Sequence, residues 1–226
     1  MNRIRATLFF VLVSVLLISE NSWNLQGGTV HPKPVPTVTF TWSLSTADPP
    51  YYSVAITPMG SVSYKSFPNS DLRTGVPYTL EFTASRAVRT RIFDLAQDLN
   101  FFAGRIAHED NQNPAVISKS FTYQLGVTQH HFVYTSTENR RVRQLASLFE
   151  DIDSTVTFRR ELEQLLAHNP SGLEAELKEL RLHNNRRKLI EFQVVAPVLQ
   201  QISSDARIPE PPRQSARSIL NEATAR

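Results

Sequence analysis

Apolar side chains alternate with hydroxyl side chains after residue 36, and this pattern predicts strands. Val38, Phe40 and Trp42 alternate with threonines, and a period of two is typical of a strand with one buried face. The same alternation predicts further strands at residues 52–56, 62–64, 78–82, 121–125 and 132–135. The Pro-Met-Gly segment at residues 58–60 predicts a hairpin turn between the second and third strands.

The hydrophobic period changes to that of a helix at Ser85. The first apolar stripe contains Val88, Ile92, Leu95, Ala96 and Leu99. Ser85 is the expected N-cap, because its hydroxyl can accept a hydrogen bond from a free amide of the first turn. Gly104 is the expected stop. A second amphipathic helix is predicted from the stripe of Val142, Leu145, Ala146, Phe149 and Ile152.

No strand pattern occurs after about Ser154. The helices predicted there cover residues 158–166, 171–180, 188–203 and 216–220. Ser171 and Glu174 match a capping box, in which two side chains satisfy free amides at the start of a helix. Pro197 is expected to bend the third of these helices.

This order of elements predicts an α+β fold: an antiparallel sheet with two amphipathic helices on one face, followed by an all-helical C-terminal extension. We place the α+β domain at residues 37–153 and the extension at 154–226. Leu173, Leu177 and Leu180 line one face of the extension, and such a face must be buried. We expect it to pack within the chain. The alternative is an interface, either with a partner or for self-association through the C-terminal helices.

Residues 1–28 have the layout of a signal peptide or N-terminal anchor. Arg3 and Arg5 precede an apolar run from Leu8 to Ile18, which is too short to cross a bilayer as a helix. Residues 29–36 are rich in proline and are expected to be a spacer. The sequence therefore predicts an exported protein, periplasmic or extracellular, whose residues 1–18 do not pack on the folded domain. If the segment is not cleaved, it tethers the protein to the inner membrane.

Composition and charge exclude several classes of function. The chain has no cysteine, which rules out disulfide-rich scaffolds, cysteine nucleophiles and iron–sulfur clusters. The net charge is +3, and removal of residues 1–28 with Arg3, Arg5 and Glu20 leaves +2. Basic clusters at residues 140–143 and 186–188 are expected to be solvated helix faces, so nucleic acid is not an expected partner.

The histidines do not form a recognisable metal motif, and no metal or cofactor is predicted. His130 and His131 are adjacent in a predicted strand, so their side chains point to opposite faces. His168 and His183 lie near predicted helix ends, where an imidazolium is stabilised by the helix dipole. The alternative metal ligands are three consecutive loop residues, His108, Glu109 and Asp110.

No catalytic residue is predicted either, because the G-x-S-x-G, G-x-G-x-x-G and P-loop patterns are absent. Carboxylate pairs for glycoside cleavage come from separate parts of a chain. The acidic residues at strand ends and loops, expected instead to be turn or surface residues, are Asp48, Asp71, Glu81 and Asp110. The aromatic residues expected to pack on or beside the sheet are Tyr51, Tyr52, Tyr64 and Tyr78.

One stretch resembles a known family. The alternation from Tyr52 to Tyr64 around Gly60, the later amphipathic helix and the Phe101-Phe102 pair at its end resemble a small exported bacterial domain family of unknown function, over residues of about 40–152. That family commonly has cysteines just before the tyrosine. Residues 47–51 here are Ala-Asp-Pro-Pro-Tyr, so a redox or metal role does not carry over, and the resemblance implies no activity.

We therefore expect a non-catalytic binding or structural module of the bacterial cell envelope, whose partner is a protein or an envelope component. The alternative is an extracytoplasmic hydrolase with a site assembled from loops. An enzyme requires a concave pocket lined by titratable groups with perturbed pKa values. A binding module should instead show a flat or grooved apolar patch.

Overall fold

The computed structural model describes residues 33–44, 50–67, 76–104, 109–110, 117–185 and 189–224. Contacts divide the chain into Met1–Lys33 and Pro34–Arg226. The predicted signal segment therefore lies outside the described residues, and its role in export stays a prediction. Within the described ranges, no helix combines the length and the hydrophobicity needed to cross a membrane.

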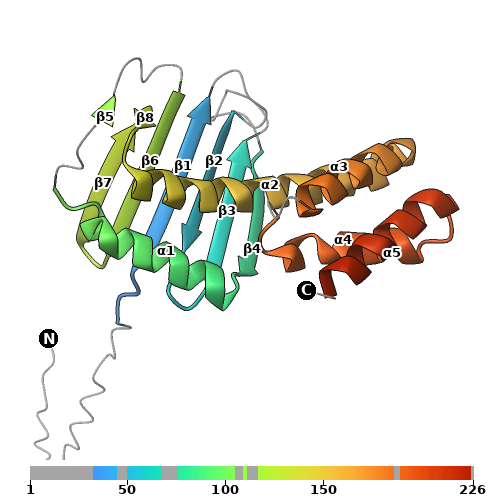
Figure 1. The fold of residues 1–226 in the computed structure, drawn as a ribbon, viewed down its shortest axis with the longest axis horizontal. Helices are drawn as coiled ribbons and strands as arrows, with labels where there is room; N and C mark the ends of the chain where they lie inside the picture. Colours follow the sequence, from blue (N-terminus) through green and yellow to red (C-terminus); the bar gives the residue numbers. More distant parts are fainter. Residues whose placement is uncertain are drawn as a thin grey trace, which may run out of the picture. The chain divides into compact units, whose positions relative to one another are not determined.

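A six-stranded antiparallel sheet forms the centre of the fold, in the order β4-β3-β2-β1-β6-β7 (Figure 1). Its strands are β1 (Thr37–Leu44), β2 (Tyr51–Ile56), β3 (Ser61–Phe67), β4 (Tyr78–Thr83), β6 (Ile117–Leu125) and β7 (Thr128–Tyr134). The short strands β5 (Glu109–Asp110) and β8 (Ser136–Thr137) pair separately and were not predicted. The predicted hairpin turn is confirmed, and Gly60 has the positive φ of 93° that favours glycine.

The two faces of the sheet differ as the alternation predicts. Helices α1 (Arg86–Asp98) and α2 (Arg140–His168) lie on the same face (Figure 1). Phe40 and Phe121 pair across β1 and β6 and are fully buried beneath them. Their neighbours Thr39 and Thr122 point to the opposite face and are only partly buried. The α+β class, with two helices on one face and a helical C-terminal part, is therefore confirmed.

Helix α1 begins where Ser85 was expected to cap it, because the Ser85 hydroxyl accepts a hydrogen bond from the Val88 amide at 3.3 Å. The helix ends at Asp98, before the predicted stop at Gly104. A left-handed turn follows, in which Asn100, Phe101 and Phe102 all have positive φ. This conformation is costly for residues other than glycine. Phe102 stabilises it by stacking on Phe121, with ring centroids 5.2 Å apart.

Helix α2 is one continuous helix of 29 residues, although the sequence predicted two helices. Its first half, to Val156, belongs to the core beneath the sheet, and its second half, from Phe158, belongs to the core of the extension. The change of core explains why the hydrophobic stripe looked interrupted. Ser154 and Thr155 donate hydrogen bonds to carbonyls four residues earlier, a bond that often bends a helix. The boundary at 153/154 falls inside α2 and stays a prediction.

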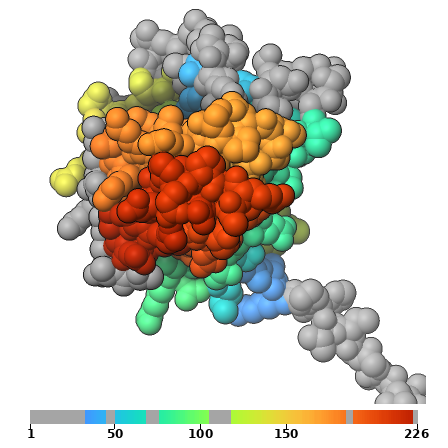
Figure 2. Space-filling view, turned by 90° about the vertical axis from the view of Figure 1, so that its right-hand side faces the viewer, coloured from blue at the N-terminus to red at the C-terminus, as the bar shows by residue number. Residues whose placement is uncertain are grey.

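The extension consists of the end of α2 with α3 (Leu173–Asn185), α4 (Ala196–Ser204) and α5 (Glu210–Thr224), which pack together (Figure 2). The leucine face of α3 is fully buried in this core, so it packs within the chain as expected. The capping box is wrong, because Ser171 lies in a short 3₁₀ helix and donates to Asn169 Oδ1. Pro197 does not bend a helix either. It lies in the first turn of α4, where its missing N–H costs nothing.

A strap of residues 189–195 returns from α3 to the sheet and joins the two cores. Glu191 is left-handed, with φ 59°, and only 5% exposed. Its carboxylate accepts hydrogen bonds from the Ser85 amide at 2.9 and 3.0 Å and from the Ser85 hydroxyl at 2.8 Å. Gln193 donates to the same carboxylate and to the Thr83 carbonyl. Glu191 therefore fixes the extension to the start of α1.

We expect Glu191→Ala to lower the free energy of unfolding by about 1–3 kcal/mol, because the Ser85 amide and hydroxyl lose a charged acceptor at a helix N-terminus. Urea unfolding followed by circular dichroism measures the change. Glu179→Ala, on the exposed surface of α3, is the matched control and is expected to alter the free energy by less than about 0.5 kcal/mol. Equal effects of the two substitutions would contradict the role given to Glu191.

Candidate functional site

One row of side chains across the sheet is polar, although it faces the helices. The register runs Tyr134, Lys119, Trp42, Tyr52, Ser66 and Tyr78 from β7 to β4. Helix α2 supplies polar partners to this row. Glu150 binds Lys119, and Glu163 accepts a hydrogen bond from Tyr78 at 3.3 Å. The row therefore forms a polar border between the apolar core and one end of the strands.

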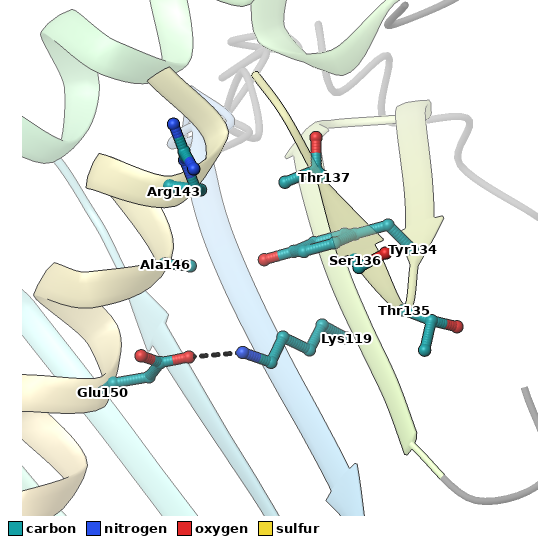
Figure 3. A pocket seen from close by; sticks show the side chains of 8 residues that line it. All are labelled: Lys119, Tyr134, Thr135, Ser136, Thr137, Arg143, Ala146 and Glu150. Carbon is teal, nitrogen blue, oxygen red and sulfur yellow. Dashed lines mark hydrogen bonds and ion pairs between the residues drawn. The ribbon is translucent and has the colours of Figure 1, made fainter. Parts of the chain in front are cut away.

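The row opens into a cleft of about 390 Å³ between α2 and strands β6, β7 and β8. It is lined by Lys119, Tyr134, Thr135, Ser136, Thr137, Arg143, Ala146 and Glu150. Helix α2 supplies Arg143, Ala146 and Glu150 on one side, and the strands supply the other side (Figure 3). All the lining side chains except that of Ala146 carry a polar or charged group, although carbon makes up most of the surface that they expose. The cleft therefore suits a small polar ligand.

The hydroxyl of Tyr134 points across the cleft toward α2 (Figure 3). Tyr134 is 3% exposed, and its buried hydroxyl makes no hydrogen bond with any described residue. Its ring is held by Phe121 and Phe132, with centroids 6.0 and 5.2 Å away. A buried polar group without a partner costs about 1–3 kcal/mol. The aromatic neighbours therefore hold a donor in place that the fold itself does not use.

Lys119 and Glu150 form an ion pair at 2.7 Å along the cleft (Figure 3). Arg143, two turns earlier on α2, is exposed and has no ion-pair partner in the part of the chain that the structure describes. The lining thus carries two positive charges and one negative charge. Burial, and to a smaller degree the charge of Glu150, raise the pKa of Tyr134, so the phenol remains protonated and can donate a hydrogen bond.

A second polar contact lies beneath α2, outside the cleft. Tyr64 donates a hydrogen bond to Asp153 Oδ1 at 2.7 Å. Burial raises the pKa of Asp153 to about 7, against the opposing effects of that hydrogen bond and of nearby Arg160. Asp153 does not line the cleft. Its perturbed carboxyl is therefore explained by burial and is not placed where a ligand binds.

The histidines lie where the sequence placed them. His130 faces the Phe101 carbonyl at 3.1 Å, whereas His131 faces the Thr122 hydroxyl on the other side of the sheet at 2.9 Å. His168 and His183 lie in the last turns of α2 and α3. Within the described ranges, no three His, Asp or Glu side chains are grouped closely enough to hold a metal ion. His108 lies outside these ranges, and the absence of a metal stays a prediction.

The other candidates from the sequence do not meet in one site. Tyr52 and Tyr64 are buried and Tyr78 is partly buried, as expected for packing on the sheet. Glu81 is exposed on β4. Asp48 and Asp71 lie outside the described residues, and only the backbone of Asp110 is described.

The cleft residues were missed by the sequence reasoning, although a signal existed for one of them. Lys119 shares the strand parity of Phe121 and Tyr123, so alternation alone places a lysine on the face that the helices cover. A cation on that face requires a partner or a ligand. Nothing in the local pattern shows that Tyr134 and Arg143 join it, because this depends on where α2 crosses the sheet.

Comparison with known proteins does not assign the chain to a family. No protein-family model matches the chain, and no curated protein matches it. The resemblance of residues of about 40–152 to an exported bacterial domain family therefore stays a prediction. The function has to be inferred from the cleft.

Proposed function

We propose that this chain is a non-catalytic ligand-binding module, exported to the cell envelope, whose ligand occupies the cleft between α2 and strands β6–β8. The observation that supports the proposal is the Tyr134 hydroxyl, which is buried, has no partner among the described residues and is directed into the cleft. Pockets for small ligands commonly place a few fixed polar groups on a preformed wall. The aromatic packing around Tyr134 supplies such a wall.

The cleft is not the apolar patch expected of a binding module, and it holds a titratable group with a raised pKa in Tyr134. Catalysis by the hydrolase alternative is nevertheless less well supported. General acid–base chemistry needs a group with a pKa near the working pH within reach of the substrate. Asp153 has such a pKa, but its carboxyl is bonded to Tyr64 outside the cleft. Tyr134 lies in the cleft, but its raised pKa keeps its proton at neutral pH. We therefore expect no turnover of nitrophenyl esters, phosphates or glycosides.

The proposal is tested by NMR titration of the ¹⁵N-labelled protein with four classes of small molecule: neutral sugars, amines, carboxylates and phosphates. At least one class is expected to shift amides at residues 134–137 and 143–150 in a saturable way. Ser136→Trp fills the cleft from an exposed position and is expected to abolish the response. Gln129→Trp, exposed elsewhere on β7, is the matched control and should retain it. Saturable shifts that survive Ser136→Trp would place the ligand elsewhere.

A further inference from the structure

The groups that line the cleft donate far more hydrogen bonds than they accept. Arg143 has five N–H donors, and the Lys119 ammonium has three, of which Glu150 accepts one at 2.7 Å. Tyr134 adds an O–H donor without a partner among the described residues. Among the described residues, Glu150 is the only carboxylate in the lining, and Lys119 already neutralises it. A ligand that satisfies this set must supply acceptors.

The charge of the lining also favours a ligand with acceptor atoms and a negative charge. With Lys119 and Glu150 paired, Arg143 leaves one positive charge in excess. An amine would be repelled by this charge, and a neutral sugar would gain little from it. A planar carboxylate or a phosphate can accept two N–H groups of one guanidinium and a phenol O–H at the same time.

The start of α2 is not the source of this preference. Asn139 caps the helix and accepts hydrogen bonds from the Arg141 and Val142 amides at 3.0 and 3.3 Å. The Asn139 amide in turn donates to Thr137. These backbone donors are therefore occupied, and recognition depends on side chains.

We infer that the cleft binds an oxyanion, the carboxylate or phosphate group of a small molecule, through the side chains of Arg143 and Tyr134. The inference rests on the proposed function and names its ligand class. Lys119 assists by its two remaining N–H donors while Glu150 holds it in position. Thr135, by contrast, points away from α2 (Figure 3) and takes no part.

Tyr134→Phe and Arg143→Gln test the two side chains separately. Tyr134→Phe removes only a hydroxyl that has no partner in the described part of the chain, so the variant is expected to fold. Arg143→Gln changes an exposed residue. Arg140→Gln is the control, because it removes the same charge from the same helix but from a residue that does not line the cleft.

The full chain, labelled with ¹³C at tyrosine Cζ and ¹⁵N in arginine, is titrated at constant ionic strength with four probes: sodium acetate, inorganic phosphate, glucose and ethylammonium chloride. We expect saturable shifts of the Tyr134 and Arg143 signals for acetate, for phosphate or for both, and the two titrations separate carboxylate from phosphate ligands. Each cleft substitution is expected to weaken binding by about tenfold, as for the loss of one charge-assisted hydrogen bond. Arg140→Gln is expected to change it by less than about twofold.

Three results would overturn the inference. A loss of affinity that is equal for Arg140→Gln and Arg143→Gln would show unspecific attraction to positive charge. Saturable binding of glucose or ethylammonium at the cleft, without binding of either anion, would overturn the ligand class and leave the proposed function standing. No saturable response to any of the four probes would overturn the inference and remove the support for a ligand-binding cleft.

Discussion

Leu177→Asp is expected to unfold the helical extension, because it places a charge in a core with no room for water. Leu177 is fully buried in the cluster that also contains Leu173, Leu180 and Leu162. Loss of a buried leucine side chain costs about 2–5 kcal/mol, and an unpaired buried charge adds several more. A loss of this size is comparable to the whole stability of many domains.

Circular dichroism and size-exclusion chromatography with light scattering measure the outcome. Leu182→Asp is the matched control, because Leu182 lies on the same helix but is 40% exposed, and we expect a change below about 1 kcal/mol. A Leu177→Asp protein that keeps its helix content and its melting temperature would show that the face is not core. If that folded variant had also lost self-association, the leucine face would be an interface after all.

Asp153→Asn is expected to stabilise the protein at alkaline pH, whereas most substitutions of buried residues destabilise a protein. The pKa of Asp153 is about 7 in the folded protein and near its ordinary value of 3.8 in the unfolded chain. Between these two pH values, the folded state holds a proton that the unfolded state has lost, so stability falls as pH rises. Above pH 7 the buried carboxylate costs about 4 kcal/mol relative to the protonated form. Asparagine avoids this cost and can still accept the Tyr64 hydrogen bond.

The free energy of unfolding in urea, measured from about pH 5 to about pH 9, checks this expectation. The advantage of Asp153→Asn over the parent should grow as pH rises and level off above pH 7. Glu176 also has a pKa raised to about 7 by burial, but its contribution is common to both proteins and cancels in the difference. Asp94→Asn on the exposed surface of α1 is the control. A constant difference across the pH range would contradict the raised pKa of Asp153.

The alternation and the helical stripes were sufficient to predict the fold class, because each of these strands and helices buries one face. Phe40 and Phe121 are buried because they lie on the alternating face of their strands, and Ile92 is buried because it lies on the apolar stripe of its helix. The sequence failed where tertiary contacts override local signals. A proline inside a helical pattern predicts a bend, but Pro197 lies in a first turn. The left-handed turn at residues 100–102 contains no glycine that would predict it.

The candidate site was less predictable than the fold for a related reason. Arg143 and Glu150 come from one helix, but Lys119 and Tyr134 come from two strands whose pairing register brings them together. Each residue has an ordinary local explanation as a strand or helix residue. The Tyr134 hydroxyl, which has no partner among the described residues, distinguishes the group, and hydrogen-bond satisfaction cannot be read from a sequence.

Helix α2 is continuous, and its first half lines the cleft. A helix of 29 residues is about 44 Å long, and its two halves belong to different cores. A tilt of the first half would move the second half as well, unless the helix flexes at Ser154 and Thr155. Because the two cores share this one backbone, we expect ligand binding in the cleft to alter the packing of the extension.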